Sequence, residues 1–275
     1  MIRKNRAAPL RVKTVAKRAT KNEHRILLIV SAVVLSALLL LASNAAKAAG
    51  SGVALESPII DQGNERSLQR GAKAFVNHCM GCHSLGYQRY SRMAEDLGLS
   101  KEDVEANLIF TTDAEGEPSK FGALMTNAMS DDYGKQAFGV VPPNLALTAR
   151  SRGVDWIYTY LKSYYLDPSK TTTGVNNLVY PGTAMPHVLG DLQGWQVAVQ
   201  EEGSAVIDSL KLETPGSLSP DEYDDMVADI TNFMAYAADP IKLTRHRVGM
   251  WVMLFLFVLL GLTYALKKEY WKDVI

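Results

Sequence analysis

The stretch Cys79-Met80-Gly81-Cys82-His83 decides what kind of domain this chain forms. Two cysteines three positions apart can each form a thioether with a vinyl group of one porphyrin. A histidine directly after the second cysteine is then placed to bind the iron. The motif therefore predicts one covalently attached haem c, with Cys79 and Cys82 as attachment residues and His83 as an axial iron ligand.

Zinc sites and thioredoxin-like redox sites use the same Cys-x-x-Cys spacing and have to be weighed against haem. A structural zinc site needs a second pair of ligands, but the chain contains only 2 cysteines. A thioredoxin-like motif lies in a βαβ unit, whereas helical periodicity precedes this one. In an oxidising compartment two free cysteines tend to form a disulfide, and thioether formation removes both thiols. Covalent haem is therefore the favoured interpretation.

The second axial ligand has to come from another part of the chain. Met185 lies in Tyr180-Pro181-Gly182-Thr183-Ala184-Met185-Pro186, a loop of small residues and prolines that can present a thioether to a flat ring. A methionine ligand would raise the reduction potential relative to two histidines. The alternatives, beginning with the nearest rival, are His187, His78, Met125 and Met129.

Hydrophobic periodicity predicts an all-α domain with long loops. We expect helices over 65–83, 155–166 and 220–238, the second with an aromatic stripe of Trp156, Tyr160 and Tyr164. Ser219-Pro220-Asp221-Glu222 has the N-cap serine, first-turn proline and glutamate of a capping box. Strand signals are weak. The ranges 111–148 and 168–218 are therefore expected to be mainly loops, and 199–217 follows no usable pattern.

Two uncharged apolar stretches predict how the chain meets a membrane. The first, 26–42, follows nine Lys or Arg within 1–25 and precedes the small-x-small pattern Ala46-Lys47-Ala48. We therefore expect 1–48 to be a basic leader and signal peptide, with an uncleaved anchor as the alternative. The second, 248–266, predicts one transmembrane helix within 245–275. Basic residues at the outer ends of both stretches place the domain 49–244 outside the cytoplasm.

The domain between these stretches is acidic, although the whole chain has a net charge of zero. Residues 49–244 contain 14 basic and 26 acidic side chains, a net charge of −12. Such a field repels nucleic acid and attracts a basic partner. A solvated surface that only aids solubility is the alternative.

Several further motifs follow the attachment motif. In chain order they are Pro142-Pro143-Asn144-Leu145, Arg150-Ser151-Arg152, Gly174-Val175-Asn176-Asn177, Ala184-Met185-Pro186 and Lys268-Glu269-Tyr270-Trp271-Lys272-Asp273. With this ordered set the chain resembles the cytochrome c1 family, the haem c subunits of the ubiquinol-cytochrome c reductase (cytochrome bc1) complex. The tail resembles bacterial members. The chain departs from the family at Asn144, where an aspartate is usual.

The resemblance implies a class I cytochrome c fold and a set of site residues. Gly71 and Phe75 of the first helix would cross Ile230 and Phe233 of the last. Met185 would be the distal iron ligand. Arg152 would pair with a haem propionate, a role that Arg150 could also fill, and Trp156 would line the pocket. A guanidinium can hold a carboxylate through two parallel hydrogen bonds.

The resemblance also implies a function, partners and a location. The protein would be the electron-transfer subunit of the reductase, without substrate chemistry of its own. It would accept one electron from the Rieske iron-sulfur protein and pass it to a cytochrome c. It would lie beside cytochrome b and membrane lipid in a dimeric complex, anchored in the bacterial inner membrane with its haem domain in the periplasm. The alternatives are a monohaem subunit of a terminal oxidase and a membrane-anchored haem sensor or assembly module.

Overall fold

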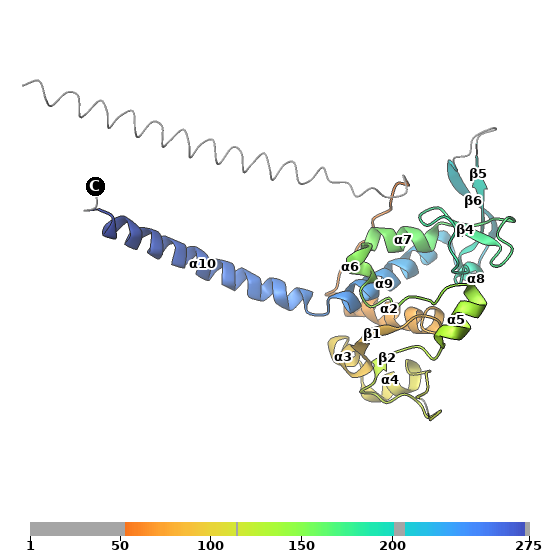
Figure 1. Cartoon of the computed structure of the whole chain (residues 1–275), viewed down its shortest axis with the longest axis horizontal. Helices are drawn as coiled ribbons and strands as arrows, with labels where there is room; N and C mark the ends of the chain where they lie inside the picture. The colour runs from red at the N-terminus through yellow and green to blue at the C-terminus, as the bar shows by residue number, and fades with distance from the viewer. Residues whose placement is uncertain (1–52, 114, 201–206, 273–275) are drawn as a thin grey trace, which may run out of the picture. The chain divides into compact units, whose positions relative to one another are not determined.

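The computed structural model describes residues 53–113, 115–200 and 207–272, so the expected leader at 1–48 lies outside the described residues. Figure 1 shows helices gathered around α2 and α9, with two small sheets beside them. The helices are α2 Glu65–His78, α3 Tyr90–Asp96, α4 Lys101–Asn107, α5 Asp131–Phe138, α6 Thr148–Ser151, α7 Val154–Lys162, α8 Gly190–Gln193, α9 Pro220–Ala238 and α10 Lys242–Tyr270. The strands are β1 Leu85–Arg89, β2 Leu124–Met125, β3 Tyr164–Leu166, β4 Val175–Asn177, β5 Gly194–Val199 and β6 Ser209–Pro215.

The crossing of α2 and α9 forms the centre of the domain and confirms the expected contact between the first and last helices. At Gly71 a Cβ atom would overlap the carbonyl of Asp229 and lie 2.8 Å from Cβ of Phe233. Phe75 and Phe233 pack with ring centroids 5.8 Å apart, and Ile230 is fully buried. The missing side chain at Gly71 therefore allows the two backbones to approach closely.

Helix α9 begins and ends where the sequence predicts. Ser219 Oγ accepts from the backbone N–H of Glu222, and the Ser219 N–H donates to Oε2 of Glu222 at 2.9 Å. These two bonds complete the capping box and satisfy backbone donors at the start of the helix.

Helix α2 is shorter than predicted, because it ends at His78 rather than at residue 83. The N–H groups of Cys79 and Met80 both donate to the carbonyl of Phe75, at 2.8 and 3.0 Å. Sharing one carbonyl breaks the helical i to i−4 pattern, and a separate turn closes through the His83 N–H and the Cys79 carbonyl at 2.9 Å. The attachment motif therefore forms a turn after the helix.

Helix α7 also ends early, at Lys162, because side chains take over the hydrogen bonds of its last turn. The Lys162 carbonyl accepts from Nε2 of Gln193 and of Gln196 at 2.9 and 2.8 Å. The chain then leaves the helix, and Tyr164–Leu166 becomes strand β3 instead of continuing the helix.

The prediction of an all-α domain is too simple, because a four-stranded sheet forms from the end of the expected helix 155–166 and from three strands within 168–218, a range expected to be mainly loop. Its order is β4-β3-β5-β6, with β3 antiparallel to β4, parallel to β5, and β5 antiparallel to β6. Strands β3 and β4 are only three residues long each, and β3 also pairs with β5, which is distant in the sequence. The stretch β3–β4 therefore carries no strong strand pattern of its own. The sequence pattern likewise predicts none of the short helices α3, α4, α5, α6 and α8, of which α5 and α8 lie in ranges expected to be loops. Helices still form the core of the domain.

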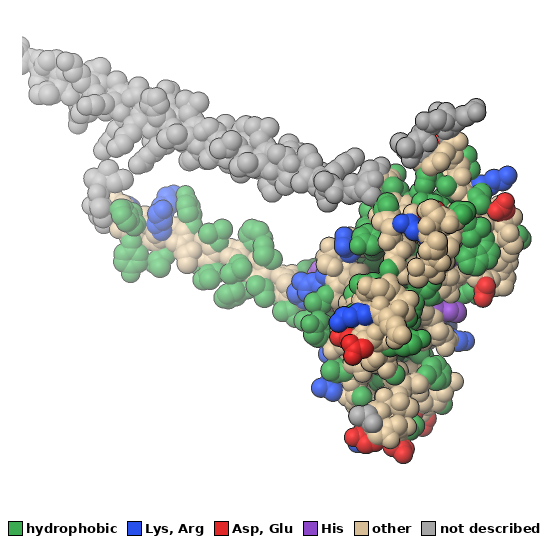
Figure 2. Space-filling model, turned by 45° about the vertical axis from the view of Figure 1, so that its right-hand side comes forward, with side chains coloured by type: hydrophobic (Ala, Val, Ile, Leu, Met, Phe, Trp, Pro, Cys, Tyr) green, Lys and Arg blue, Asp and Glu red, His purple; other side chains and the backbone are tan. Residues whose placement is uncertain are grey.

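Helix α10 contains the predicted span 248–266 and is long and apolar enough to cross a membrane. Its 29 residues at a rise of about 1.5 Å each give about 44 Å, more than the roughly 30 Å of a hydrocarbon core. Figure 2 shows hydrophobic side chains along this helix and basic side chains near its end. Tyr270 and Trp271 follow the span and suit the membrane interface.

Candidate functional site

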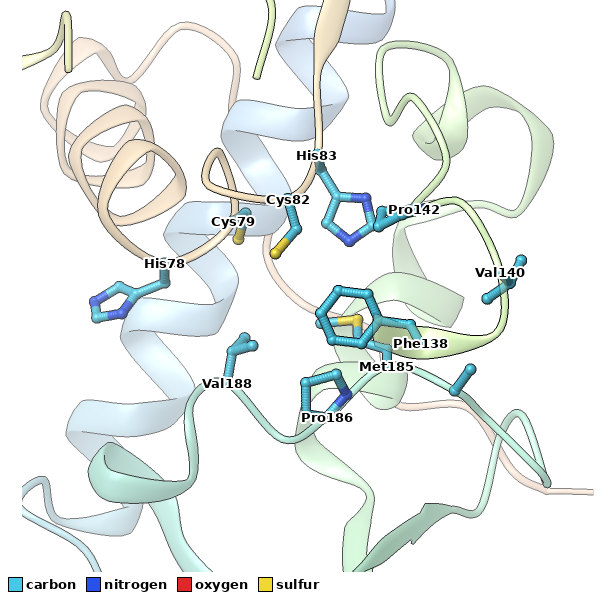
Figure 3. Close-up of a pocket in the computed structure, with 11 residues that line it drawn as sticks. His78, Cys79, Cys82, His83, Phe138, Val140, Pro142, Met185, Pro186 and Val188 are labelled. Carbon is cyan, nitrogen blue, oxygen red and sulfur yellow. The ribbon is translucent and has the colours of Figure 1, made fainter. Parts of the chain in front are cut away.

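The turn after α2 brings the two thiols and the His83 ring to one side of the motif. Cys79 is buried, Cys82 is half-buried, and neither is in a disulfide. Figure 3 shows the Cys82 sulfur and the His83 ring directed toward a common space beside Met185. Burial raises the pKa of the Cys79 thiol to about 12, which disfavours the thiolate that a zinc site would need. Among the residues described, no group of three or more His, Cys, Asp or Glu could hold a metal ion.

A backbone carbonyl fixes the tautomer of His83. The distance from Nδ1 of His83 to the carbonyl oxygen of Pro143 is 2.8 Å. Because a carbonyl can only accept, Nδ1 carries the hydrogen and the other ring nitrogen, Nε2, keeps its lone pair. Burial also lowers the pKa of His83, which favours the neutral ring. A backbone carbonyl on the second nitrogen is the usual support of a metal-binding histidine.

Asn127 and Ser84 hold the end of the attachment motif in place. Nδ2 of Asn127 donates to the Cys82 carbonyl at 2.6 Å, and its Oδ1 accepts from Ser84 Oγ at 2.6 Å. The backbone N–H of Asn127 in turn donates a hydrogen bond to Ser84 Oγ at 2.9 Å. No sequence pattern singles out Asn127, which contacts the motif only after the chain has folded.

Two adjoining cavities share Cys79, His83 and Met185 in their walls. Their volumes are about 60 and 430 Å³, and the larger one falls in the range typical of cofactor pockets. Apolar residues form much of the wall of the larger cavity, among them Leu145, Ile157, Leu161, Ile230 and Met234. Two thiols at the edge, an unprotonated imidazole nitrogen, a thioether and an apolar wall fit a covalently bound haem.

His83 lines both cavities. Of the other methionines and histidines that the structure describes, Met185 alone also lines both. Met125 is fully buried in the core, and Met129 lies beside Gly134 of α5. In Figure 3 the His78 ring points away from His83.

His187, the nearest rival, is held away from the cavities by aromatic neighbours. Its ring stacks on Tyr164 with centroids 4.7 Å apart and meets Trp195 edge-on at 5.7 Å. Burial lowers the pKa of His187 to about 4. It lines neither of the two cavities next to His83.

The structure separates the two arginines that the sequence leaves as equal candidates. Arg152 lines the larger cavity, and its guanidinium carbon lies 5.2 Å from the centroid of the Trp156 ring. Trp156 lines the same cavity and stacks on Tyr160 with centroids 4.9 Å apart. Arg150 is exposed and is not part of this wall.

Two buried asparagines support the loop that carries Met185. Oδ1 of Asn177 accepts from the N–H groups of Val179 and Tyr180 at 2.9 and 3.1 Å. Oδ1 of Asn176 accepts from the N–H of Gly182 at 2.7 Å. The Gly174-Val175-Asn176-Asn177 motif therefore positions the loop that carries Met185, a role that its sequence alone does not indicate.

Asn144, the position that departs from the family pattern, accepts two backbone bonds near the cavity. Its Oδ1 lies 2.9 Å from the N–H of Ala146 and 3.2 Å from that of Gly86. An aspartate would also accept both bonds, so the asparagine preserves this contact without the negative charge.

This helical core, with its Cys-x-x-Cys-His turn facing a methionine loop, defines the protein as a c-type cytochrome. The model of the Cytochrome C1 family matches residues 56–210 and 216–274. Cytochrome c1 of Allochromatium vinosum is 53% identical over 246 residues, covering 88% of this chain and 98% of that protein. The chain belongs to the cytochrome c1 family. It is accordingly a membrane-anchored electron carrier of the cytochrome bc1 reductase that carries one covalently bound haem c.

Two further similar proteins extend the comparison. The ammonia monooxygenase gamma subunit of Nitrosomonas europaea is 46% identical over 236 residues, covering 86% of this chain and 95% of that protein. A chain of a hyperthermophilic respiratory complex III matches with a TM-score of 0.44 and 19% identity, covering 92% of this chain and 99% of that one.

Proposed function

We propose that Cys79 and Cys82 would hold the haem through thioethers, and that Nε2 of His83 and the sulfur of Met185 would bind its iron. The observation that carries this proposal is the shared cavity. His83 and Met185 line it together, and the Pro143 carbonyl leaves Nε2 of His83 free to bind. The haem supplies a one-electron couple between Fe(III) and Fe(II).

The residues of this chain set the conditions for electron transfer. With His83 and Met185 both bound, the iron has no open position, which suits a relay without substrate chemistry. The apolar wall excludes water, and Arg152 offsets the charge of a propionate at the rim of the cavity. Methionine ligation favours a higher potential than two histidines would.

The acidic domain and the terminal helix support a finer proposal about partners and location. Residues 1–48 are a leader that is removed, 49–244 form the periplasmic haem domain, and 245–275 contain the anchor in the bacterial inner membrane. The protein would accept an electron from the Rieske iron-sulfur protein and pass it to a basic cytochrome c, with its anchor beside cytochrome b in a dimeric complex. The charge of −12 over 49–244 favours a basic acceptor.

The axial ligand can be tested with Met185→Ala. The oxidised variant should lose the methionine-to-iron charge-transfer absorption, and its reduced form should bind carbon monoxide, because one iron position has opened. Reduced parent protein should be indifferent to carbon monoxide, which separates a carrier from a gas sensor. Met129→Ala, a similarly half-buried methionine outside both cavities, is the control. An unchanged Met185→Ala spectrum would transfer the role to His187 or another methionine.

The partners can be tested by purifying the tagged full chain in a mild detergent. We expect quinol-cytochrome c reductase activity to co-purify with the tag. The rate with a basic cytochrome c should fall as salt is raised, because screening weakens attraction by the acidic domain. Association with an oxygen-reducing complex instead would favour the terminal-oxidase alternative, and a rate independent of ionic strength would contradict docking by charge.

A further inference from the structure

A row of buried hydroxyl groups connects α7 to the loop that carries Met185. Tyr164 OH donates to Tyr160 OH at 2.6 Å, and Tyr160 OH lies 2.8 Å from Oγ1 of Thr183. The backbone N–H of Met185 donates to the same Thr183 oxygen at 3.3 Å. Tyr160 and Thr183 therefore link α7 to the backbone of the proposed sulfur ligand, and Tyr164 of β3 extends the row at its other end.

The direction of these bonds follows from the hydrogens available. Tyr160 OH already accepts from Tyr164, so its own hydrogen is left to donate to Thr183. Burial raises the pKa of both Tyr160 and Tyr164, so both hydroxyls remain protonated donors. Thr183 then accepts from Tyr160 on one side and from the Met185 N–H on the other.

Aromatic packing shields this row from water and holds its members in place. Tyr160 is covered by Trp156 with ring centroids 4.9 Å apart, and Tyr164 by His187 with centroids 4.7 Å apart. Thr183 is 5% exposed. A hydroxyl that loses its partner here cannot readily turn to solvent, so each bond restrains the loop more than an exposed one would.

The row acts on the part of the loop that the asparagines do not reach. Asn176 and Asn177 bind backbone groups at 179, 180 and 182. The Met185 N–H is bound by Thr183 instead. Thr183 and Met185 also line the same cavity as His83, so a shift of Thr183 moves the sulfur relative to the iron.

We propose that Tyr160 and Thr183 are positioning residues for Met185, and that their hydrogen bond keeps the thioether on the iron and thereby holds the reduction potential high. This inference rests on the proposed function, in which Met185 is the axial ligand. Methionine ligation raises the potential, so a loop that lets the sulfur dissociate lowers it. Removing one outer hydrogen bond of a metal ligand weakens binding without changing the ligand itself.

The test compares side chains of matched shape in the detergent-solubilised full chain with its haem. Thr183→Val removes the hydroxyl and keeps the volume, whereas Thr183→Ser keeps the hydroxyl. Tyr160→Phe removes the other partner of the same bond. Tyr158→Phe is the control, because the Tyr158 hydroxyl lies on the same helix but contacts Lys162 at 3.4 Å.

Three readouts follow the iron rather than the fold: the methionine-to-iron charge-transfer absorption, the reduction potential, and the rate at which cyanide displaces the ligand from the oxidised protein. Thr183→Val and Tyr160→Phe should weaken the absorption and lower the reduction potential. Both variants should also bind cyanide about two- to tenfold faster, the range expected for the loss of one hydrogen bond. Thr183→Ser and Tyr158→Phe should match the parent protein.

The outcomes separate this inference from the function on which it rests. If Met185→Ala loses the absorption while Thr183→Val and Tyr160→Phe keep parental values in all three readouts, the ligand assignment stands and the positioning role is wrong. If Met185→Ala leaves the spectrum unchanged, the ligand assignment itself fails. Should Thr183→Val not fold, Tyr160→Phe tests the same bond from α7. A Thr183→Ser variant that behaves like Thr183→Val would also contradict the role of the hydroxyl.

Discussion

At Gly71 the backbone of α2 comes so close to that of α9 that no side chain fits between them. A Cβ atom there would overlap the Asp229 carbonyl and press on Phe233. Gly71→Ala should therefore force the helices apart and destabilise the protein by about 1–3 kcal/mol, the usual cost of overpacking a core. Denaturant unfolding of the haem-loaded protein, followed by circular dichroism, measures this loss.

Gly122→Ala makes the same chemical change where a Cβ atom meets nothing within 4 Å. The control should unfold at the parental midpoint or slightly above it, because alanine restricts the unfolded chain. Equal stability of the Gly71 and Gly122 variants would mean that the crossing tolerates a methyl group and that the backbones are not in contact at this point.

Single residues also show how far the sequence predicts the site. The attachment cysteines and His83 are adjacent in the chain, so their spacing alone indicates haem. Met185 stands out because its loop is unusual, although His187 stays open until the structure shows its ring packed on Tyr164. Asn127 and the Tyr160–Thr183 bond depend on contacts between distant segments, which a single sequence does not contain.

At the scale of elements, the sequence predicts best where one stretch determines its own structure. Helix α9 carries its own capping box, and α10 contains the uncharged apolar stretch 248–266, so both are predicted correctly. The end of α2 is wrong for a local reason, since the attachment motif forms its own turn after the Phe75 carbonyl. The end of α7 is wrong by several residues because it depends on the side chains of Gln193 and Gln196, which are distant in the sequence. The sheet is missed for the same reason, since β3 finds its partners in β4 and β5.

For the whole molecule, the number of segments that hold the chain in the membrane depends on whether the leader is removed. The apolar helix α10 provides one anchor, and the stretch 26–42 provides a second only if the leader is not removed. A chain ending at residue 244 distinguishes the two cases. If signal peptidase cuts after Ala48, the shortened haem protein should appear in the soluble periplasmic fraction after a high-salt wash, while the full chain stays in the membrane.

A second variant tests whether removal of the leader is what releases the shortened chain from the membrane. Glutamates in place of Ala46 and Ala48 destroy the small-x-small pattern in the chain that ends at residue 244. With the leader retained, 26–42 is nearly long enough to span the bilayer, so this variant should return to the membrane fraction. Sequencing of the amino terminus would confirm a start at Ala49 in the soluble form. The contrary result is a chain that ends at residue 244, keeps Ala46 and Ala48, begins at Met1 and still remains in the membrane. Because this chain lacks α10, only the leader could hold it there. The full chain would then have two anchors.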